Sequence, residues 1–224
     1  MAVITISRQY GSGGDEIAAK VCELLKYCYF DKQMMSRLAA ELALPAGQSV
    51  DFSEEDYRVR TFMERFFRAP CSQPVAQVKS WKETPDGTRV AEVVDLDEAN
   101  AMFLERSAIL AAHRQGNMVI VGRGGQVVLK EKHGTLHVRI EAPLDFRVEH
   151  VKEQENLSLA AARDLVMQRD QSAANYLKHF YKVDWSDPLL YHLVINTCRF
   201  ELDAAACLIA CSVNCLSLAL CGTC

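Results

Sequence analysis

The chain has 224 residues, of which 50% are hydrophobic and 24% charged, and its formal net charge is -4 at pH 7. This composition is typical of a globular protein that can bury a full core, and we expect one α/β domain over residues 1–224. No basic run indicates nucleic-acid binding, no uninterrupted apolar stretch predicts a membrane span, and the first residues do not resemble a signal peptide. These features favour a cytoplasmic protein, and they do not predict an oligomeric state.

The chain begins with an apolar strand over residues 3–6, a glycine-rich turn, and a helix over residues 14–25. Such a turn is typical of phosphate-binding loops. Its glycines let backbone N–H groups converge, and the start of the helix adds unpaired donors and a partial positive charge. The residues that we assign to this cradle are Arg8, Gly11, Ser12, Gly13 and Gly14.

The charge of this turn departs from the usual phosphate-loop pattern, G-x-x-x-x-G-K-[ST]. With Gly14 as the last glycine, Asp15 stands in the lysine position and Glu16 in the hydroxyl position. Acids stabilise the start of a helix but repel a triphosphate. Arg8 can supply the missing positive charge to a phosphate, or it can instead pair with one of the two acids.

Further strands and helices alternate along the chain. Asp31 is expected to cap a helix over residues 32–42. Residues 45–97 change in composition and form either an inserted substrate-side lobe or a peripheral helical insertion. The remaining elements follow the hydrophobic periodicity. The strands are expected at residues 29–30, 118–122, 136–141 and 193–197, and the helices at residues 97–115, 144–154, 159–174 and from 202 onward.

This alternation predicts a parallel sheet with helices on both faces, in which ligands bind beyond the carboxyl ends of the strands. A second glycine-rich turn, residues 122–125, follows the strand that ends at residue 122. Two such turns at strand ends indicate a phosphorylated ligand. Arg123 lies in the second turn and needs an anion, either a ligand or an internal acid. Arg147 either reaches back to the first turn or forms a surface ion pair.

Several segments resemble the bacterial cytidylate kinase-like family, a divergent branch of the P-loop nucleoside monophosphate kinases. They include residues 4–14, 119–125, 187–191 and 193–197. The resemblance implies a P-loop NTPase-like parallel sheet flanked by helices, with a helical substrate lobe and a lid over residues 156–187. It also implies transfer of the ATP γ-phosphoryl group to a nucleoside monophosphate, CMP or dCMP, with Mg²⁺.

The resemblance also implies roles for single residues. Catalysis is assigned to Arg123, Arg163 and Arg169, and binding of the acceptor nucleotide to Asp31, Arg123 and Asp170. A solvated helix face explains Arg163 equally well. Relatives usually carry arginine where this chain has Asp15 and Ala173. The alternatives are therefore a weakened or inactive nucleotide-binding protein of the same fold, or a kinase for another small acceptor.

The chain has nine cysteines, which we interpret as reduced thiols, and residues 210–224 form a cysteine-rich tail. Cys207, Cys211 and Cys215 are spaced by four residues and would share one face of a helix. Their spacing does not match a four-ligand metal site. We therefore assign no metal ligands, and a metal or redox site remains the less favoured alternative.

Overall fold

The computed structural model describes residues 2–31, 34, 81–83, 89–91 and 98–219, and the chain divides into two compact units. One unit comprises residues 31–115. Its described part contains the antiparallel hairpin of β3 (Trp81–Glu83) and β4 (Arg89–Ala91) and the helix α4 (Glu98–Gln115). Most of the expected substrate-side lobe and of the helix over residues 32–42 lies outside the described residues. That lobe therefore stays a prediction.

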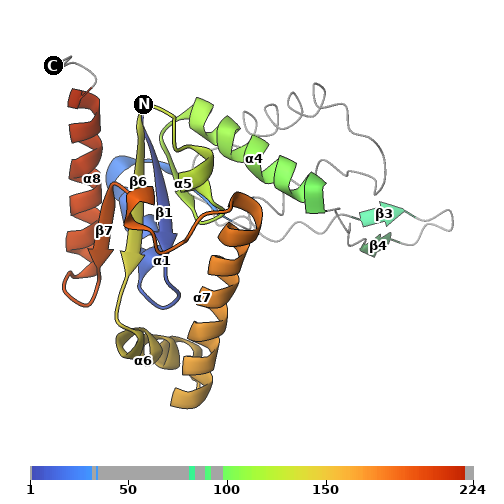
Figure 1. Cartoon of the computed structure of the whole chain (residues 1–224), viewed down its shortest axis with the longest axis vertical. Helices are drawn as coiled ribbons and strands as arrows, with labels where there is room; N and C mark the ends of the chain where they lie inside the picture. The colour runs from blue at the N-terminus through green and yellow to red at the C-terminus, as the bar shows by residue number, and fades with distance from the viewer. Residues whose placement is uncertain (1, 32–33, 35–80, 84–88, 92–97, 220–224) are drawn as a thin grey trace. The chain divides into compact units, whose positions relative to one another are not determined.

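The other unit, residues 1–30 and 116–224, is built on a five-stranded parallel sheet (Figure 1). Its strands lie in the order β2-β5-β1-β6-β7, which puts the N-terminal strand β1 in the centre. The bounds are β1 (Val3–Arg8), β2 (Cys28–Phe30), β5 (Met118–Val121), β6 (Thr135–Glu141) and β7 (Leu193–Asn196). The expected parallel sheet is confirmed, and each expected strand is present.

Two pairs of helices accompany this sheet. The first helix, α1, pairs with the last helix, α8, and α6 pairs with α7. The bounds are α1 (Gly14–Leu25), α5 (Gly125–Val128), α6 (Leu144–Glu155), α7 (Leu159–Tyr181) and α8 (Leu202–Ala219). The helix α7 runs seven residues past its expected end, since Leu177 buries against the unit, and the chain reverses only at Lys182 with φ 56°.

The apolar residues form two clusters in the described part of this unit. The larger one joins one face of the sheet to α1 and α8, and its buried members include Ile4, Ile6, Ile17, Val138 and Ile209. The smaller cluster lies between α6 and α7, and Tyr10 of the glycine-rich turn packs against it. The second cluster therefore fixes α6 and α7 beside the turn that follows β1.

The cysteines of the described residues include free thiols and one disulfide-bonded residue. Cys22, Cys198, Cys207, Cys211 and Cys215 are free. Cys28 is disulfide-bonded, so the expectation of reduced thiols throughout is wrong at that position. Among the helices of the described residues, none is long and apolar enough to cross a membrane.

A stacked histidine pair, of which His137 is buried and His192 exposed, joins β6 to the residue that precedes β7. The His137 ring in β6 stacks on His192 with centroids 4.9 Å apart, and its Nδ1 lies 2.8 Å from the Thr5 hydroxyl of β1. Burial, and to a smaller extent the electrostatic effect of His192, lower the pKa of His137 from its ordinary 6.5 to about 4. His137 is therefore neutral in the folded protein near neutral pH.

The low pKa of His137 predicts a loss of stability in mild acid. Because the unfolded chain takes up a proton near pH 6.5 and the folded chain only near pH 4, this stability is present above the unfolded pKa. It is lost as pH falls through that range. When the pH is lowered from about 7.5 to about 5, the free energy of unfolding measured in urea should fall by about 2 kcal/mol more in the parent protein than in His137→Asn. An equal loss in both proteins would contradict this assignment.

Candidate phosphate-binding site

The two glycine-rich turns lie next to each other at the carboxyl edge of the sheet. Because β1 and β5 pair in parallel, Gly122 donates its N–H to the Ile6 carbonyl at 2.9 Å. A Cβ added to Gly122 would lie 2.9 Å from Nη1 of Arg8. Arg8 belongs to the first turn, and its side chain lies against the second. The two turns therefore share one site, as expected from their positions at strand ends.

Arg8 is paired with an acid of its own loop. Its Nε donates to the Asp15 carboxylate at 2.9 Å, and the two side chains are 35% and 54% exposed. Of the two sequence-based alternatives, this structure contains the ion pair. An incoming phosphate must therefore compete with Asp15 for the Arg8 guanidinium, and solvent access at both side chains keeps that competition possible.

The start of α1 offers backbone donors beside Arg8. Gly13 precedes the helix in a left-handed conformation with φ 75°, and the first intrahelical bond runs from Ile17 N–H to the Gly13 carbonyl. The N–H groups of Gly14, Asp15 and Glu16 consequently have no acceptor within the helix. Together with the positive end of the helix dipole, these donors can hold an anion.

The glycines of the loop are also required by packing. A Cβ at Gly11 would lie 2.7 Å from Cγ2 of Val151 in α6, and one at Gly13 would lie 2.6 Å from Leu202 of α8. Both residues have positive φ, which disfavours any L side chain. The glycine pattern thus reflects the close approach of two helices as well as an anion site.

A largely buried ion pair fastens α6 and α7 to this loop. Arg147 of α6 donates from Nε to the Ala142 carbonyl at 2.9 Å, and from Nη1 to the Tyr10 carbonyl at 3.0 Å and to Asp170 Oδ2 at 2.6 Å. The other oxygen of Asp170 accepts from the Tyr10 N–H at 2.9 Å. Arg147 therefore reaches back to the turn, and both Asp170 oxygens are engaged inside the protein.

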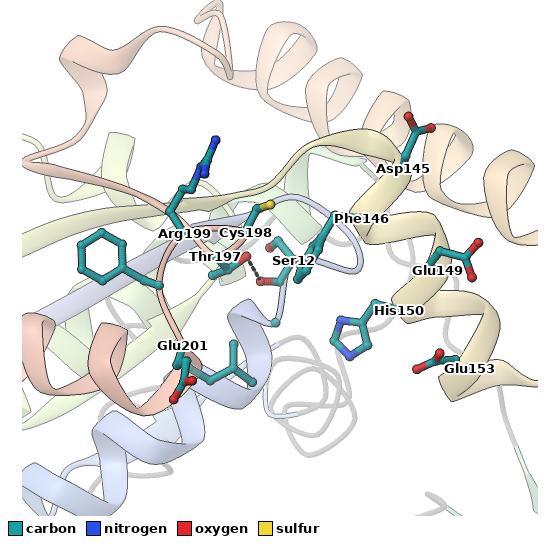
Figure 2. Close-up of a pocket in the computed structure, with 13 residues that line it drawn as sticks. Ser12, Asp145, Phe146, Glu149, His150, Glu153, Thr197, Cys198, Arg199 and Glu201 are labelled. Atoms are coloured by element: carbon teal, nitrogen blue, oxygen red, sulfur yellow. Dashed lines mark hydrogen bonds between the residues drawn. The ribbon is translucent and has the colours of Figure 1, made fainter.

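A hollow of about 850 Å³ opens beside the loop (Figure 2). Ser12 and Gly13 form one side, α6 another, and the segment from Thr197 to Leu202 a third. The Thr197 hydroxyl donates to the Ser12 carbonyl at 2.8 Å, which ties this segment to the loop. Phe146 and Phe200, which also line the hollow, are 42% and 46% exposed and offer apolar surface to a ligand.

The lining of the hollow is acidic. Four carboxylates line it, and Arg199 is the one arginine or lysine among its described lining residues. The carboxylates belong to Asp145, Glu149, Glu153 and Glu201. A polyanion entering here needs positive charge from the loop or from a bound cation. In the described residues, no group of three or more His, Cys, Asp and Glu is arranged to hold a metal ion by itself.

The remaining residues assigned from the sequence lie in several places. Arg123 has φ 56° in the second turn, and its guanidinium lies 5.8 Å from the centroid of the Tyr176 ring of α7. Arg169 lies over the Tyr10 ring at 5.7 Å. Arg163 forms an exposed pair with Asp145, as its surface alternative expects. Asp31, in the other unit, accepts from the Met34 N–H, and most of the helix that it is expected to cap lies outside the described residues.

Sequence reasoning missed a second support of the site. Trp185 Nε1 donates to the Ser7 hydroxyl at 2.8 Å, one residue before Arg8. Arg139 donates to the Trp185 carbonyl and lies over its ring at 4.6 Å. This cluster ties the segment after α7 to β1. Its members are far apart in the sequence, so no local spacing predicts that they meet.

A glycine-rich turn that follows the central strand of a parallel sheet and leads into a helix is typical of P-loop NTPase-like α/β proteins. This is the class that the fold and the site support. The sequence model described as the cytidylate kinase-like family matches residues 3–199 of the chain. The chain belongs to this family, and the resemblance seen in the sequence is confirmed.

The individual curated relatives share only about a third of their residues with the chain over the matched segments. A curated cytidylate kinase of Methanocaldococcus jannaschii is 31% identical over 93 residues, which are 40% of this chain and 52% of the relative. One of Pyrococcus horikoshii is 28% identical over 112 residues, 50% of this chain and 56% of the relative. The chain thus spans about half the length of these curated relatives. A crystal structure of an uncharacterized protein from Eubacterium ventriosum has the same fold, with a TM-score of 0.61, 16% identity, and coverage of 96% and 99% of the two chains.

Proposed function

We propose that the protein transfers the γ-phosphoryl group of ATP to a nucleoside monophosphate, with CMP or dCMP as the acceptor. Membership of the cytidylate kinase-like family supports this class of reaction. The observation that carries the proposal is the meeting of the two glycine-rich turns around Arg8, beside the start of α1. Donors and a cation gathered there fit the negative charge of a transferred phosphoryl group.

On this proposal the triphosphate follows the first turn and the nucleoside occupies the hollow. The free N–H groups at the start of α1 hold phosphate oxygens, and Arg8 exchanges Asp15 for the ligand. Phe146 and Phe200 give the base apolar contacts. Arg123, Arg163 and Arg169 remain the proposed sources of positive charge around the transferred group, and Asp31 and Asp170 the proposed acceptor contacts.

ATP and Mg²⁺ are compatible with this donor set. Mg²⁺ keeps several waters and binds through one or two carboxylates plus the phosphates of its nucleotide. The hollow carries carboxylates and no described three-ligand cluster, so the ion would arrive with ATP rather than occupy a protein cage. Bound there, Mg²⁺ would neutralise phosphate charge and offset the acidic lining.

A second candidate is a nucleotide-binding protein that transfers no phosphoryl group. The Arg8–Asp15 ion pair favours it, because the cation nearest to the loop is already neutralised. Both oxygens of Asp170 are likewise engaged by Arg147 and Tyr10. The two candidates share the same nucleotide site and differ in turnover.

One experiment separates the candidates. The purified chain is incubated with Mg-ATP and each nucleoside monophosphate while ADP formation is followed, and ATP binding is measured by calorimetry. We expect turnover with CMP or dCMP, and loss of ATP binding in Arg8→Gln. Lys20→Gln removes a cation that pairs with Asp203 on the surface. This variant should leave turnover and ATP binding unchanged. ATP binding without turnover on any acceptor would overturn the kinase proposal, and no ATP binding would overturn both.

A further inference from the structure

The last helix, α8, separates a buried apolar face from an exposed face of thiols. Its buried residues include Ala205, Ala206, Ile209 and Val213, and they belong to the core shared with α1. Figure 1 shows α8 at one side of the sheet, next to β7. The cysteines Cys207, Cys211 and Cys215 are all free and all exposed. The sequence pattern therefore places three thiols in one row on the outside of the helix, and the proposed kinase chemistry uses none of them.

The spacing within the row decides which chemistry is open to these thiols. Residues four apart on a helix have Cβ atoms about 5–6 Å apart. A disulfide needs Cβ atoms about 3.5–4.5 Å apart, so neighbouring thiols of this row cannot join while the helix is intact. A metal ion with two bonds to sulfur of about 2.3 Å can hold two sulfurs up to about 4.6 Å apart. Sulfur atoms on Cβ atoms about 5–6 Å apart can reach this separation while the helix stays intact.

The surroundings decide the kind of ion. Within the described residues there is no cluster of three or more His, Cys, Asp and Glu suited to a metal, which speaks against a four-ligand zinc site. Thiolates without oxygen ligands select soft ions such as Cu(I). The site therefore requires an ion that is stable with two sulfur ligands.

We propose that α8 binds one soft, two-coordinate cation of the Cu(I) type between neighbouring thiolates. Cys211 is the ligand common to both possible pairs, with Cys207 on one side and Cys215 on the other. On binding, two S–H groups release their protons to solvent and two metal–sulfur bonds form, and neither sulfur nor metal changes oxidation state.

The test uses the full chain, kept free of oxygen and without a disulfide-reducing agent so that the Cys28 disulfide stays closed, with Cu(I) as the probe in competition with bicinchoninate. Because Cys221 and Cys224 lie outside the described residues and have a spacing common in metal sites, both are replaced by serine in the starting protein. We expect this protein to take one Cu(I) per monomer from the chelator. Cys207→Ser and Cys215→Ser should each keep the ion, because one pair survives.

Cys211→Ser should lose the ion, because it breaks both pairs. Cys198→Ser removes another exposed free thiol outside the row, and should behave like the starting protein. Circular dichroism checks that each variant keeps its helices. Retention of Cu(I) by Cys211→Ser would overturn the proposal. So would metal-dependent dimers in size-exclusion chromatography, because they would show that the thiols of two chains share the ion.

Discussion

Replacing Arg147 by methionine is expected to lower the free energy of unfolding by about 3–5 kcal/mol. The Arg147 and Asp170 side chains are only 6% and 19% exposed, and methionine fills much of the same volume without any donor. The substitution leaves the Asp170 carboxylate and the carbonyls of Tyr10 and Ala142 without their shared partner. Urea unfolding at constant m-value measures the difference.

The matched control is Arg163→Met. Arg163 of α7 also pairs with an aspartate of α6, Asp145. The two side chains are 52% and 89% exposed. We expect this variant to lose less than about 1 kcal/mol, since exposed pairs are weak. If the two variants lost the same small amount, the buried pair would not be what fastens α6 and α7 to the phosphate loop.

Asp15→Arg is expected to raise the affinity for ATP by about 2–3 kcal/mol, or roughly 30- to 150-fold. The substitution removes the carboxylate that now holds Arg8, and it adds a second cation at the start of α1. Both changes favour a polyanion at this place. Calorimetric titration of the variant and of the parent protein with Mg-ATP at the same ionic strength measures the change.

Glu16→Arg makes the same change in net charge one residue further along the helix. Glu16 accepts from Gln154 and does not pair with Arg8 in the structure, so this variant leaves the Arg8–Asp15 pair in place. We expect it to gain much less affinity than Asp15→Arg. Equal gains would show that the overall charge of the helix start matters, rather than the release of Arg8.

The local features of the site followed from the sequence with few errors. The strand, glycine turn and helix at residues 3–25 depend on neighbouring residues and appear as expected. The parallel sheet followed from the alternation of elements, since only a parallel order lets each helix cover the sheet. The end of α7 was misplaced, because burial of Leu177 outweighs the weak helix signal there.

The pairings of the charged residues did not follow from the sequence. Arg8 had two open interpretations, and so did Arg147, since a long flexible side chain reaches several acids and spacing cannot choose among them. Asp170 was assigned to a nucleotide by resemblance, yet in the structure it binds Arg147 and the Tyr10 N–H. The contacts that decide these cases join residues up to 160 positions apart.

By itself, then, the sequence determined the parallel α/β fold, the family, and the position of a phosphate loop between β1 and α1. These properties depend on periodicity, on glycines and on chain order, which are local. Only the tertiary structure decided that Arg8 faces Asp15, that α6 and α7 are fastened to the loop by Arg147, and that the acidic hollow adjoins it. These depend on which side chains meet after packing, because the strength of a charge pair is set by its burial and its geometry.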